Sequence, residues 1–253
     1  MSFPYLRKLE KRKKMSNVFS RTQLLVGSEG IKKLNEAKVI IFGIGGVGGY
    51  IAEALARSGV GHLTLVDNDV VSVSNINRQI IALHSTVGRY KTEVMKERIL
   101  DINPDCEVET FNLFYDLNNA DSFDFSKYDY VADAIDSVKS KIELIVRAKN
   151  AGTPVISAMG AGNKLCPDMF EIADLSKTTV CPLARIMRKE LKLRGITHLK
   201  VCYSKEAPVV PLLSDEEKNG RIVPGSTAFS PSVMGLVIAS EIVKDIVTSS
   251  SVK

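Results

Sequence analysis

Apolar positions in the first half of the chain alternate between short continuous runs and a helical repeat. Val39–Phe42 is an apolar run rich in β-branched residues, which predicts a buried strand. Tyr50–Ser58 places its apolar residues at helical spacing and ends at Gly59, so it predicts a helix. His62–Val66 predicts a second strand. A strand, a helix and a strand in close succession indicate a parallel pair with a crossover helix.

The same alternation continues to the middle of the chain. Apolar spacing predicts a helix over Lys91–Ile102 and a strand over Glu107–Phe111. A second helix is predicted over Lys139–Asn150, between a strand over Tyr128–Ile135 and one that begins at Pro154–Ser157. We therefore expect an α/β fold of the Rossmann-like kind, with a mostly parallel sheet and flanking helices.

The second half is less regular. Phe170–Ala173 and Leu199–Tyr203 predict strands, and Pro182–Arg194 predicts a basic amphipathic helix. Pro208–Arg221 carries proline, acid and glycine signals, which predict a long mobile loop. Pro231–Val247 is apolar, but three charged residues interrupt it, so we expect a packed helix and no stable membrane association.

The amino-terminal segment divides into a basic stretch and a helical one. Arg7–Lys14 is strongly basic and is typical of a solvated arm. Phe19–Gly27 predicts a short helical lead-in, and Glu29–Ala37 predicts a helix that feeds the first strand.

Composition narrows the class of protein. The 253 residues are 45% hydrophobic and 25% charged, as in an ordinary globular protein. The net charge of +5 permits a nucleic-acid partner without requiring one. The four cysteines form no C-x-x-C pair, which argues against a four-cysteine zinc site, and no secretory segment precedes them. We expect a cytoplasmic protein with reduced thiols.

A glycine-rich turn follows the first predicted strand. Gly43, Gly45 and Gly48 have the G-x-G-x-x-G spacing, and a helix begins directly after them. Glycines let the backbone approach an anion, and the helix start offers unpaired N–H groups to phosphate oxygens. Asp67 ends the second strand, where an acid can accept hydrogen bonds from a ribose. The pattern predicts a nucleotide site.

Charged residues near this turn indicate which nucleotide binds. Gly43, Asp67 and Asp136 each follow a predicted parallel strand, so they are expected at one edge of the sheet. Asp69, Arg78 and Lys91 add charge that a nicotinamide cofactor does not need but a triphosphate with Mg²⁺ does. Each charge taken alone is also typical of a solvated surface; their convergence at one edge favours a site.

Three stretches together resemble the ubiquitin-activating-enzyme-like adenylating superfamily. They are VIIFGIGGVGGYIAEALARSGVGHLTLVDNDVVSVSNINRQ, TVGRYKTEVMKERILDINP and DAIDS. The resemblance implies ATP and Mg²⁺ as cofactors and a reaction in which a carboxylate attacks the α-phosphate of ATP. It also implies that nucleotide-binding roles belong to Gly43, Gly45, Gly46, Gly48, Asp67, Asp69, Asn75 and Gln79.

Catalytic roles are implied by the same resemblance. Arg78 would contact the triphosphate, Lys91 would stabilise the charge that develops during displacement, and Asp136 would hold Mg²⁺. Arg21 resembles a family arginine that reaches into the partner subunit's site, which implies a homodimer. The expected organisation is a basic arm over 1–18, an ATP-binding adenylation domain over 19–165, and a substrate and dimer portion over 166–253 that continues the same fold.

The second half determines the expected substrate. DAIDSVKSKIELI, EIADLSKTTVCPLARIMRKELKLRGI and CYSKEAP resemble the tRNA threonylcarbamoyladenosine dehydratases. That branch uses ATP to activate the carboxylate of the modified nucleoside, and the neighbouring carbamoyl group then closes a ring with net loss of water. The implied partners are tRNA carrying threonylcarbamoyladenosine and a sulfur-acceptor or cysteine desulfurase protein. The alternatives are an adenylyltransferase for a sulfur-carrier protein and a non-catalytic dimeric scaffold.

Two further features of the second half, a pair of cysteines and a basic helix, each allow two interpretations. Cys181 and Cys202 suit a thioester role by analogy with ubiquitin activation, although small packed cysteines are the more common case. Basic residues crowd the predicted helix Pro182–Arg194, where they suit phosphate contacts with tRNA or a solvated face. The three histidines are expected to be structural.

Overall fold

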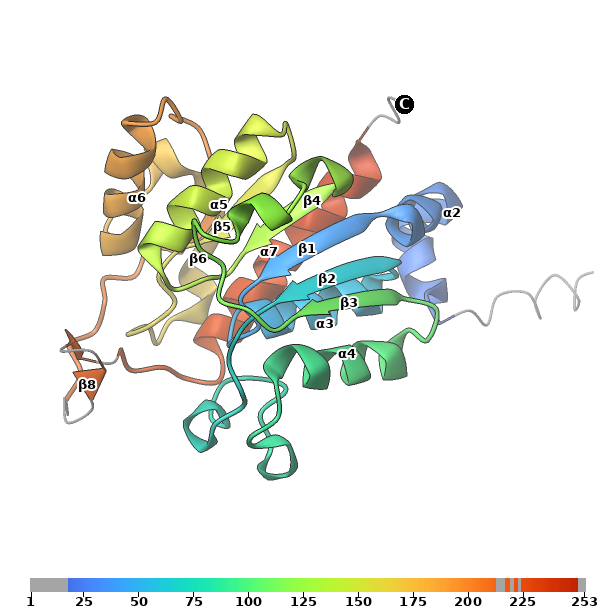
Figure 1. Cartoon of the computed structure of the whole chain (residues 1–253), viewed down its shortest axis with the longest axis horizontal. Coiled ribbons are helices and arrows are strands. Elements are labelled where there is room, and N and C mark those ends of the chain that lie inside the picture. Colours follow the sequence, from blue (N-terminus) through green and yellow to red (C-terminus); the bar gives the residue numbers. More distant parts are fainter. Residues whose placement is uncertain (1–17, 213–216, 219–220, 223, 250–253) are drawn as a thin grey trace, which may run out of the picture.

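A computed structural model describes residues 18–212, 217–218, 221–222 and 224–249 of the chain (Figure 1). In this part, one sheet has the strand order β3-β2-β1-β4-β5-β7-β6. Neighbouring strands are parallel except for β6, which pairs antiparallel with β7. The strands are β1 Lys38–Phe42, β2 His62–Val66, β3 Glu107–Phe111, β4 Tyr130–Asp133, β5 Val155–Ala158, β6 Phe170–Asp174 and β7 Lys200–Ser204. The expected α/β class with a mostly parallel sheet is confirmed.

Helices cover both faces of this sheet (Figure 1). On one face lie α3, α4 and α7, with α2 packed against α7. On the other face lie α5 and α6. The helices are α2 Ser20–Glu36, α3 Gly48–Ser58, α4 Lys91–Ile102, α5 Val138–Asn150, α6 Pro182–Lys192 and α7 Ser230–Thr248.

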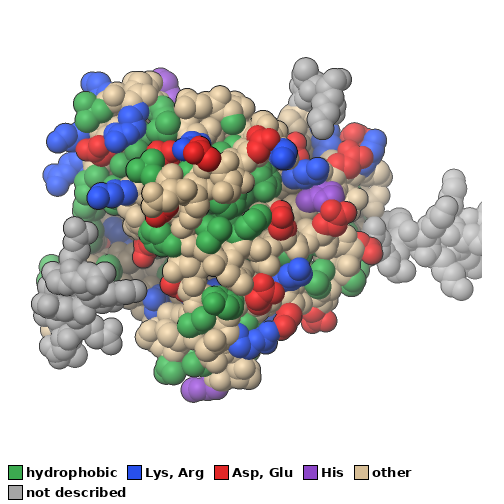
Figure 2. Space-filling model, viewed as in Figure 1, with side chains coloured by type: hydrophobic (Ala, Val, Ile, Leu, Met, Phe, Trp, Pro, Cys, Tyr) green, Lys and Arg blue, Asp and Glu red, His purple; other side chains and the backbone are tan. Residues whose placement is uncertain are grey.

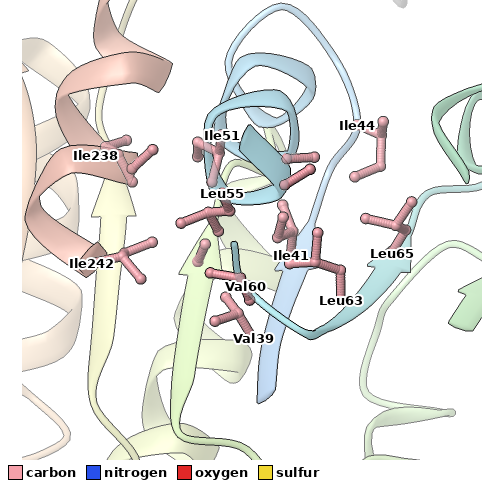
Figure 3. Close-up of a cluster of buried hydrophobic side chains, with 14 of the residues drawn as sticks. Val39, Ile41, Ile44, Ile51, Leu55, Val60, Leu63, Leu65, Ile238 and Ile242 are labelled. Carbon is pink, nitrogen blue, oxygen red and sulfur yellow. The ribbon is translucent and has the colours of Figure 1, made fainter. Parts of the chain in front are cut away.

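The apolar run of β1 explains why the sheet is central. Val39 and Ile41 point to the α3 and α7 side, whereas Ile40 and Phe42 point to the α5 side. All four side chains are fully buried, because the parallel strand has helices on both faces. Figure 3 shows the first of these cores, where β1 and β2 meet α3 and the Ile238 side of α7.

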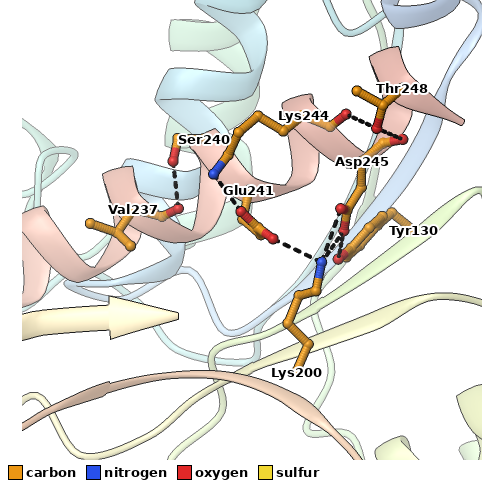
Figure 4. Close-up of polar contacts among 8 residues, drawn as sticks. All are labelled: Tyr130, Lys200, Val237, Ser240, Glu241, Lys244, Asp245 and Thr248. Atoms are coloured by element: carbon orange, nitrogen blue, oxygen red, sulfur yellow. Dashed lines mark hydrogen bonds and ion pairs between the residues drawn. The ribbon is translucent and has the colours of Figure 1, made fainter. Parts of the chain in front are cut away.

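A polar cluster fastens α7 to the sheet (Figure 4). The Lys200 ammonium on β7 donates to the carboxylates of Glu241 (2.8 Å) and Asp245 (2.7 Å) on α7. Asp245 also accepts a hydrogen bond from the Tyr130 hydroxyl on β4 at 2.7 Å. The last helix is therefore tied to two strands of the sheet by side-chain contacts. Among the described residues, no helix is long and apolar enough to cross a bilayer.

Most predicted elements agree with the structure, with a few differences. The two helical segments predicted before β1 both lie in α2, and the non-helical Gly27, whose φ is 73°, separates them by a kink where the prediction divided them. The predicted strand Tyr128–Ile135 is shorter, because Asp133 accepts a hydrogen bond from the Ile135 N–H and the chain turns there. The segment Pro208–Arg221, predicted as a long mobile loop, overlaps a short hairpin of β8 Glu217–Lys218 and β9 Arg221–Ile222. The basic arm Arg7–Lys14 lies outside the described residues, as do residues 213–216 and 219–220 of the loop that was predicted to be mobile.

Candidate functional site

A cleft of about 980 Å³ lies at the carboxyl edge of the sheet. The segments that follow β1, β2, β3, β4 and β5 all contribute to its lining. The sheet order reverses between β1 and β4, and such a reversal is where ligands bind in open α/β sheets. Ten of the predicted site residues line this cleft: Gly43, Gly45, Gly46, Asp67, Asp69, Asn75, Arg78, Gln79, Lys91 and Asp136.

The glycine turn forms one wall of the cleft, and its positions require glycine for different structural reasons. Gly43 has a φ of 86°, and a side chain there would sit 2.6 Å from the Ala134 carbonyl oxygen. A Cβ on Gly48 would lie only 1.7 Å from the Gly43 carbonyl oxygen, so α3 can start here only with glycine. Gly48 itself does not line the cleft.

Unpaired backbone donors face the cleft along this turn. Among the described residues, the N–H groups of Gly45, Gly46 and Val47 have no hydrogen-bond acceptor, and all three residues line the cleft. They lead directly into the first turn of α3, where the helix dipole adds partial positive charge. Such a turn is suited to phosphate oxygens.

Asp67 is fixed by two backbone hydrogen bonds. Its carboxylate accepts from the N–H of Ile44 at 2.6 Å and from the N–H of Asp69 at 2.8 Å. The first bond holds the glycine turn against the end of β2. Burial raises the pKa of Asp67 above its ordinary value, although Lys91 and the two N–H donors act in the opposite direction.

Lys91 and Asp69 form an ion pair in the cleft, with 2.7 Å between the ammonium and the carboxylate. The Lys91 side chain is 6% exposed and that of Asp69 is 56% exposed. The backbone enforces this proximity, because the Lys91 N–H donates to the Asp69 carbonyl and Val70 pairs with Tyr90. A buried cation is thus held at the start of α4 and faces the cleft.

The segment between β2 and α4 supplies three more polar residues. Arg78 donates to the Ser74 carbonyl at 2.8 Å and to the Asn77 side chain at 2.9 Å. Asn75 is buried, and its amide oxygen accepts from the Ser72 N–H. Gln79 is 7% exposed, and its Oε1 has no partner among the described residues. An unpaired amide oxygen in the cleft wall is available to a ligand.

Asp136 is exposed in the loop between β4 and α5. Below it lies a buried network that the sequence analysis did not identify. Asp133 accepts from the Lys141 ammonium at 2.8 Å and from the Ser157 hydroxyl at 2.6 Å, and all three residues are fully buried. The network joins the ends of β4 and β5 to α5. The sequence does place an acid, Asp133, in a predicted strand and a lysine, Lys141, in the helix predicted after it. Neither the strand pattern nor the helix pattern indicates that these two side chains are buried.

Other lining residues were also missed. Leu113, Phe114 and Tyr115 follow β3, so the strand-end argument applied to β1, β2 and β4 would have found them. Pro224, Ser226 and Pro231 line the cleft from the carboxyl-terminal part, and no local pattern indicated this.

Several predicted residues lie elsewhere. Arg21 is exposed on α2 and is absent from the cleft lining, so the described chain does not supply it to its own site. Cys181 and Cys202 are both buried, and burial raises the pKa of the Cys202 thiol to about 12, which favours the packed interpretation. His62 and His198 each contact one carboxylate. Among the described residues, no group of three or more His, Cys, Asp or Glu side chains could hold a metal ion by itself.

The arrangement suits one kind of ligand. Free N–H groups, the cations of Arg78 and Lys91, and the carboxylates of Asp67 and Asp136 share one cleft. Magnesium in nucleotide sites is typically held by one or two carboxylates together with phosphate oxygens, so the donors present fit that ion. The cleft can therefore bind a nucleoside polyphosphate with a divalent cation and stabilise negative charge on its phosphates.

Comparison with known proteins agrees with this geometry. The sequence pattern that defines the ThiF family matches residues 19–252. The chain is 43% identical over 249 residues to a Bacillus subtilis tRNA threonylcarbamoyladenosine dehydratase, covering 94% of this chain and 98% of that protein. It is 40% identical over 201 residues to the Escherichia coli dehydratase, covering 76% of this chain and 75% of that protein. The crystal structure of the Escherichia coli dehydratase TcdA in complex with ATP matches at 36% identity and a TM-score of 0.82, over 90% of this chain and 93% of that one.

Proposed function

The chain belongs to the ThiF family, and we propose that it is an ATP-dependent tRNA threonylcarbamoyladenosine dehydratase. The observation that carries the proposal is the cleft itself, where free backbone donors and the buried Lys91 lie beside Asp67 and Asp136. Extended similarity to the Bacillus subtilis dehydratase supports the choice of substrate.

The proposed reaction has two steps. The carboxylate of the threonylcarbamoyl group attacks the α-phosphorus of ATP, the bond to the β-phosphate breaks, and pyrophosphate leaves. The neighbouring carbamoyl group then attacks the activated acyl carbon, AMP leaves, and a proton is lost to solvent. The substrate loses one water in total. Because the attacking group is already part of the substrate, no protein nucleophile is needed, which agrees with the burial of Cys181 and Cys202.

The chain's own residues have separable roles in this proposal. The N–H groups of Gly45, Gly46 and Val47 hold phosphate oxygens, and Asp67 accepts from the ribose hydroxyls. Arg78 and Lys91 stabilise the charge of the displaced pyrophosphate. Asp136 would hold Mg²⁺, which when bound neutralises part of the phosphate charge.

The test uses tRNA that carries threonylcarbamoyladenosine. The protein is incubated with this tRNA, ATP and Mg²⁺, and the nucleosides are analysed by mass spectrometry. We expect a product lighter by one water, formed only with ATP and absent with Asp136→Ala, whose exposed side chain leaves the fold intact. A protein that leaves the nucleoside unchanged but adenylates a small carrier ending in Gly-Gly would instead be a sulfur-carrier adenylyltransferase.

We also propose that the enzyme is a homodimer in which Arg21 serves the partner's cleft. Arg21 is exposed on α2, next to Leu24 and Leu25, which are 73% and 89% exposed. Exposed apolar side chains of this size on one helix suit a protein interface. If the proposal is right, mixing inactive Arg21→Ala and Lys91→Ala variants restores turnover, because a mixed dimer has one complete site.

A sulfur-acceptor or cysteine desulfurase partner stays a prediction. Among the described cysteines, Cys166 is the exposed one.

A further inference from the structure

The helix α6 presents a row of three cations to solvent. Arg185, Lys189 and Lys192 are spaced four and three residues apart, so they lie on one face of the helix, and all three are exposed. Among the described residues, none of the three has a carboxylate partner. Figure 2 shows Lys and Arg side chains gathered over α6, at the upper left of the view. We call these three residues the α6 stripe.

Two other cations of the same region form hydrogen bonds within the protein and do not belong to the stripe. The Arg188 guanidinium donates to the Leu175 and Thr178 carbonyl oxygens at 3.0 and 2.8 Å. Arg194 donates to the Glu190 carboxylate at 3.1 Å and neutralises it. Arg188 keeps its charge but directs its guanidinium to protein oxygens, so the cations of α6 that have no partner among the described residues are those of the stripe.

The opposite face of α6 fixes the direction of the stripe. Ala184, Met187 and Leu191 are buried in the core beneath the helix. The helix also begins beside the candidate site, because a Cβ on Gly160 would lie 3.8 Å from the Cys181 sulfur, and the next residues, Ala161 and Gly162, line the cleft. The stripe thus starts near the cleft and runs away from it.

We propose that the α6 stripe binds the phosphodiester backbone of the RNA whose modified nucleoside occupies the cleft. The inference rests on the proposed function, since it supplies the RNA. From Arg185 to Lys192 the helix rises about 10 Å, so the three cations can contact more than one phosphate of a nucleic-acid strand. The contacts are to phosphates, so they position the RNA without reading its sequence.

A membrane surface is the competing partner for a basic helix. Ile186 and Leu193 are 45% and 73% exposed, and apolar residues beside cations also suit anionic lipid. Membrane-bound amphipathic helices, however, insert an apolar face, and the apolar face of α6 is buried in the protein core. The burial favours RNA.

The experiment compares the variant Lys189→Gln/Lys192→Gln with Lys38→Gln/Lys127→Gln. The control removes the same charge from the exposed Lys38 at the start of β1 and the exposed Lys127 in the turn before β4, where Lys127 lies 3.6 Å from the Asp124 carboxylate. Binding of tRNA is followed by fluorescence anisotropy from 0.05 to 0.3 M NaCl, as a set of about six salt concentrations. Each lost phosphate contact lowers the salt slope by about 0.7–0.9, so the stripe variant is expected to lose about 1.4–1.8 in slope and on the order of 30-fold in affinity at 0.1 M salt.

The control is expected to match the unmodified protein in slope and affinity. An unchanged slope in the stripe variant overturns the proposal. Binding to vesicles of phosphatidylcholine and phosphatidylserine that the stripe variant alone loses, with tRNA affinity unchanged, also overturns it and assigns the surface to lipid. If tRNA binding depends on the stripe but the nucleoside loses no water, the RNA surface stands and the proposed reaction fails.

Discussion

The Lys141 ammonium lies 2.8 Å from the Asp133 carboxylate, and neither side chain has any exposed surface. The same ammonium donates to the Ala158 carbonyl at 3.0 Å, and Asp133 also accepts from the Ile135 N–H. The pair thereby ties β4, β5 and α5 together three residues before Asp136. The shape of the loop that carries Asp136 therefore depends on an ion pair that does not line the cleft.

Removing one member of this pair should be costly. Lys141→Met leaves the Asp133 carboxylate buried without its cation, and we expect the free energy of unfolding to fall by about 3–5 kcal/mol. Urea denaturation measures the loss. The double variant Asp133→Leu/Lys141→Met is expected to recover most of it, because no uncompensated charge remains. A loss below about 1 kcal/mol in the single variant would contradict the burial of the pair.

Two glycines of the turn should respond differently to alanine. Gly48→Ala places a Cβ 1.7 Å from the Gly43 carbonyl oxygen, so the backbone must move, and we expect a loss of stability of about 3 kcal/mol or more. Gly45→Ala meets nothing closer than 3.7 Å, so the fold should survive while the added methyl group weakens ATP binding. Thermal unfolding and ATP titration separate the two. Equal stability of both variants would refute this account.

Lys91 is expected to act on the rate of the reaction more than on binding of the nucleotide. Its ammonium is held in the cleft by Asp69. Lys91→Met should lower kcat by about 10²–10³, the usual loss when one donor to a developing negative charge is removed. Pyrophosphate release at saturating ATP measures this, and Lys96→Met on the same helix is the control. A rise in KM for ATP with kcat unchanged would assign Lys91 to ground-state binding.

Asp67 should make ATP binding sensitive to mild acid. The ionised carboxylate accepts hydrogen bonds, and its pKa is raised by burial, so it gains a proton at a higher pH than an ordinary aspartate. Affinity for ATP is therefore expected to be full above this raised pKa and to fall as the pH drops through it. Calorimetric titration at several pH values tests the trend. In Asp67→Asn, affinity should be weaker and should not change across that window.

Lys200 links stability to pH through α7. Lys200→Met leaves Glu241 and Asp245 without their shared cation, and we expect the free energy of unfolding to fall by about 2 kcal/mol. The control Lys205→Met, whose side chain is exposed, is expected to cost less. Lys200 and Lys244 lower the pKa of Glu241. The stabilisation from the Lys200–Glu241 pair is therefore fully present above the ordinary pKa of a glutamate. It is lost as the pH falls through the lowered pKa of Glu241. Urea unfolding at neutral and acidic pH should show that the stabilities of Lys200→Met and of the unmodified protein become similar in acid.

Local pattern predicted much of the fold, because strand and helix spacing report which side chains are buried. His62–Val66, Lys91–Ile102 and Glu107–Phe111 have the bounds that the pattern indicated. The strand-end argument also placed Gly43, Asp67 and Asp136 at one edge of the sheet, and the structure brings them into one cleft.

The remaining features depend on contacts between distant parts of the chain. The Asp133–Lys141 pair is recognisable only once both side chains are known to be buried. Pro231 packs on Gly46 across most of the sequence, and no periodicity encodes that contact. Arg188 looked like its exposed neighbours until its hydrogen bonds to Leu175 and Thr178 distinguished it.

The contribution of Pro231 to the cleft has a consequence for synthesis of the protein. Pro231 is in the first turn of α7, and α7 also packs so closely on α3 that a Cβ on Gly235 would lie 2.5 Å from the Val47 carbonyl oxygen. The glycine turn precedes this supporting wall by most of the described sequence. During translation the turn therefore leaves the ribosome well before Pro231 and Gly235, so this wall of the cleft is added only after the turn has emerged.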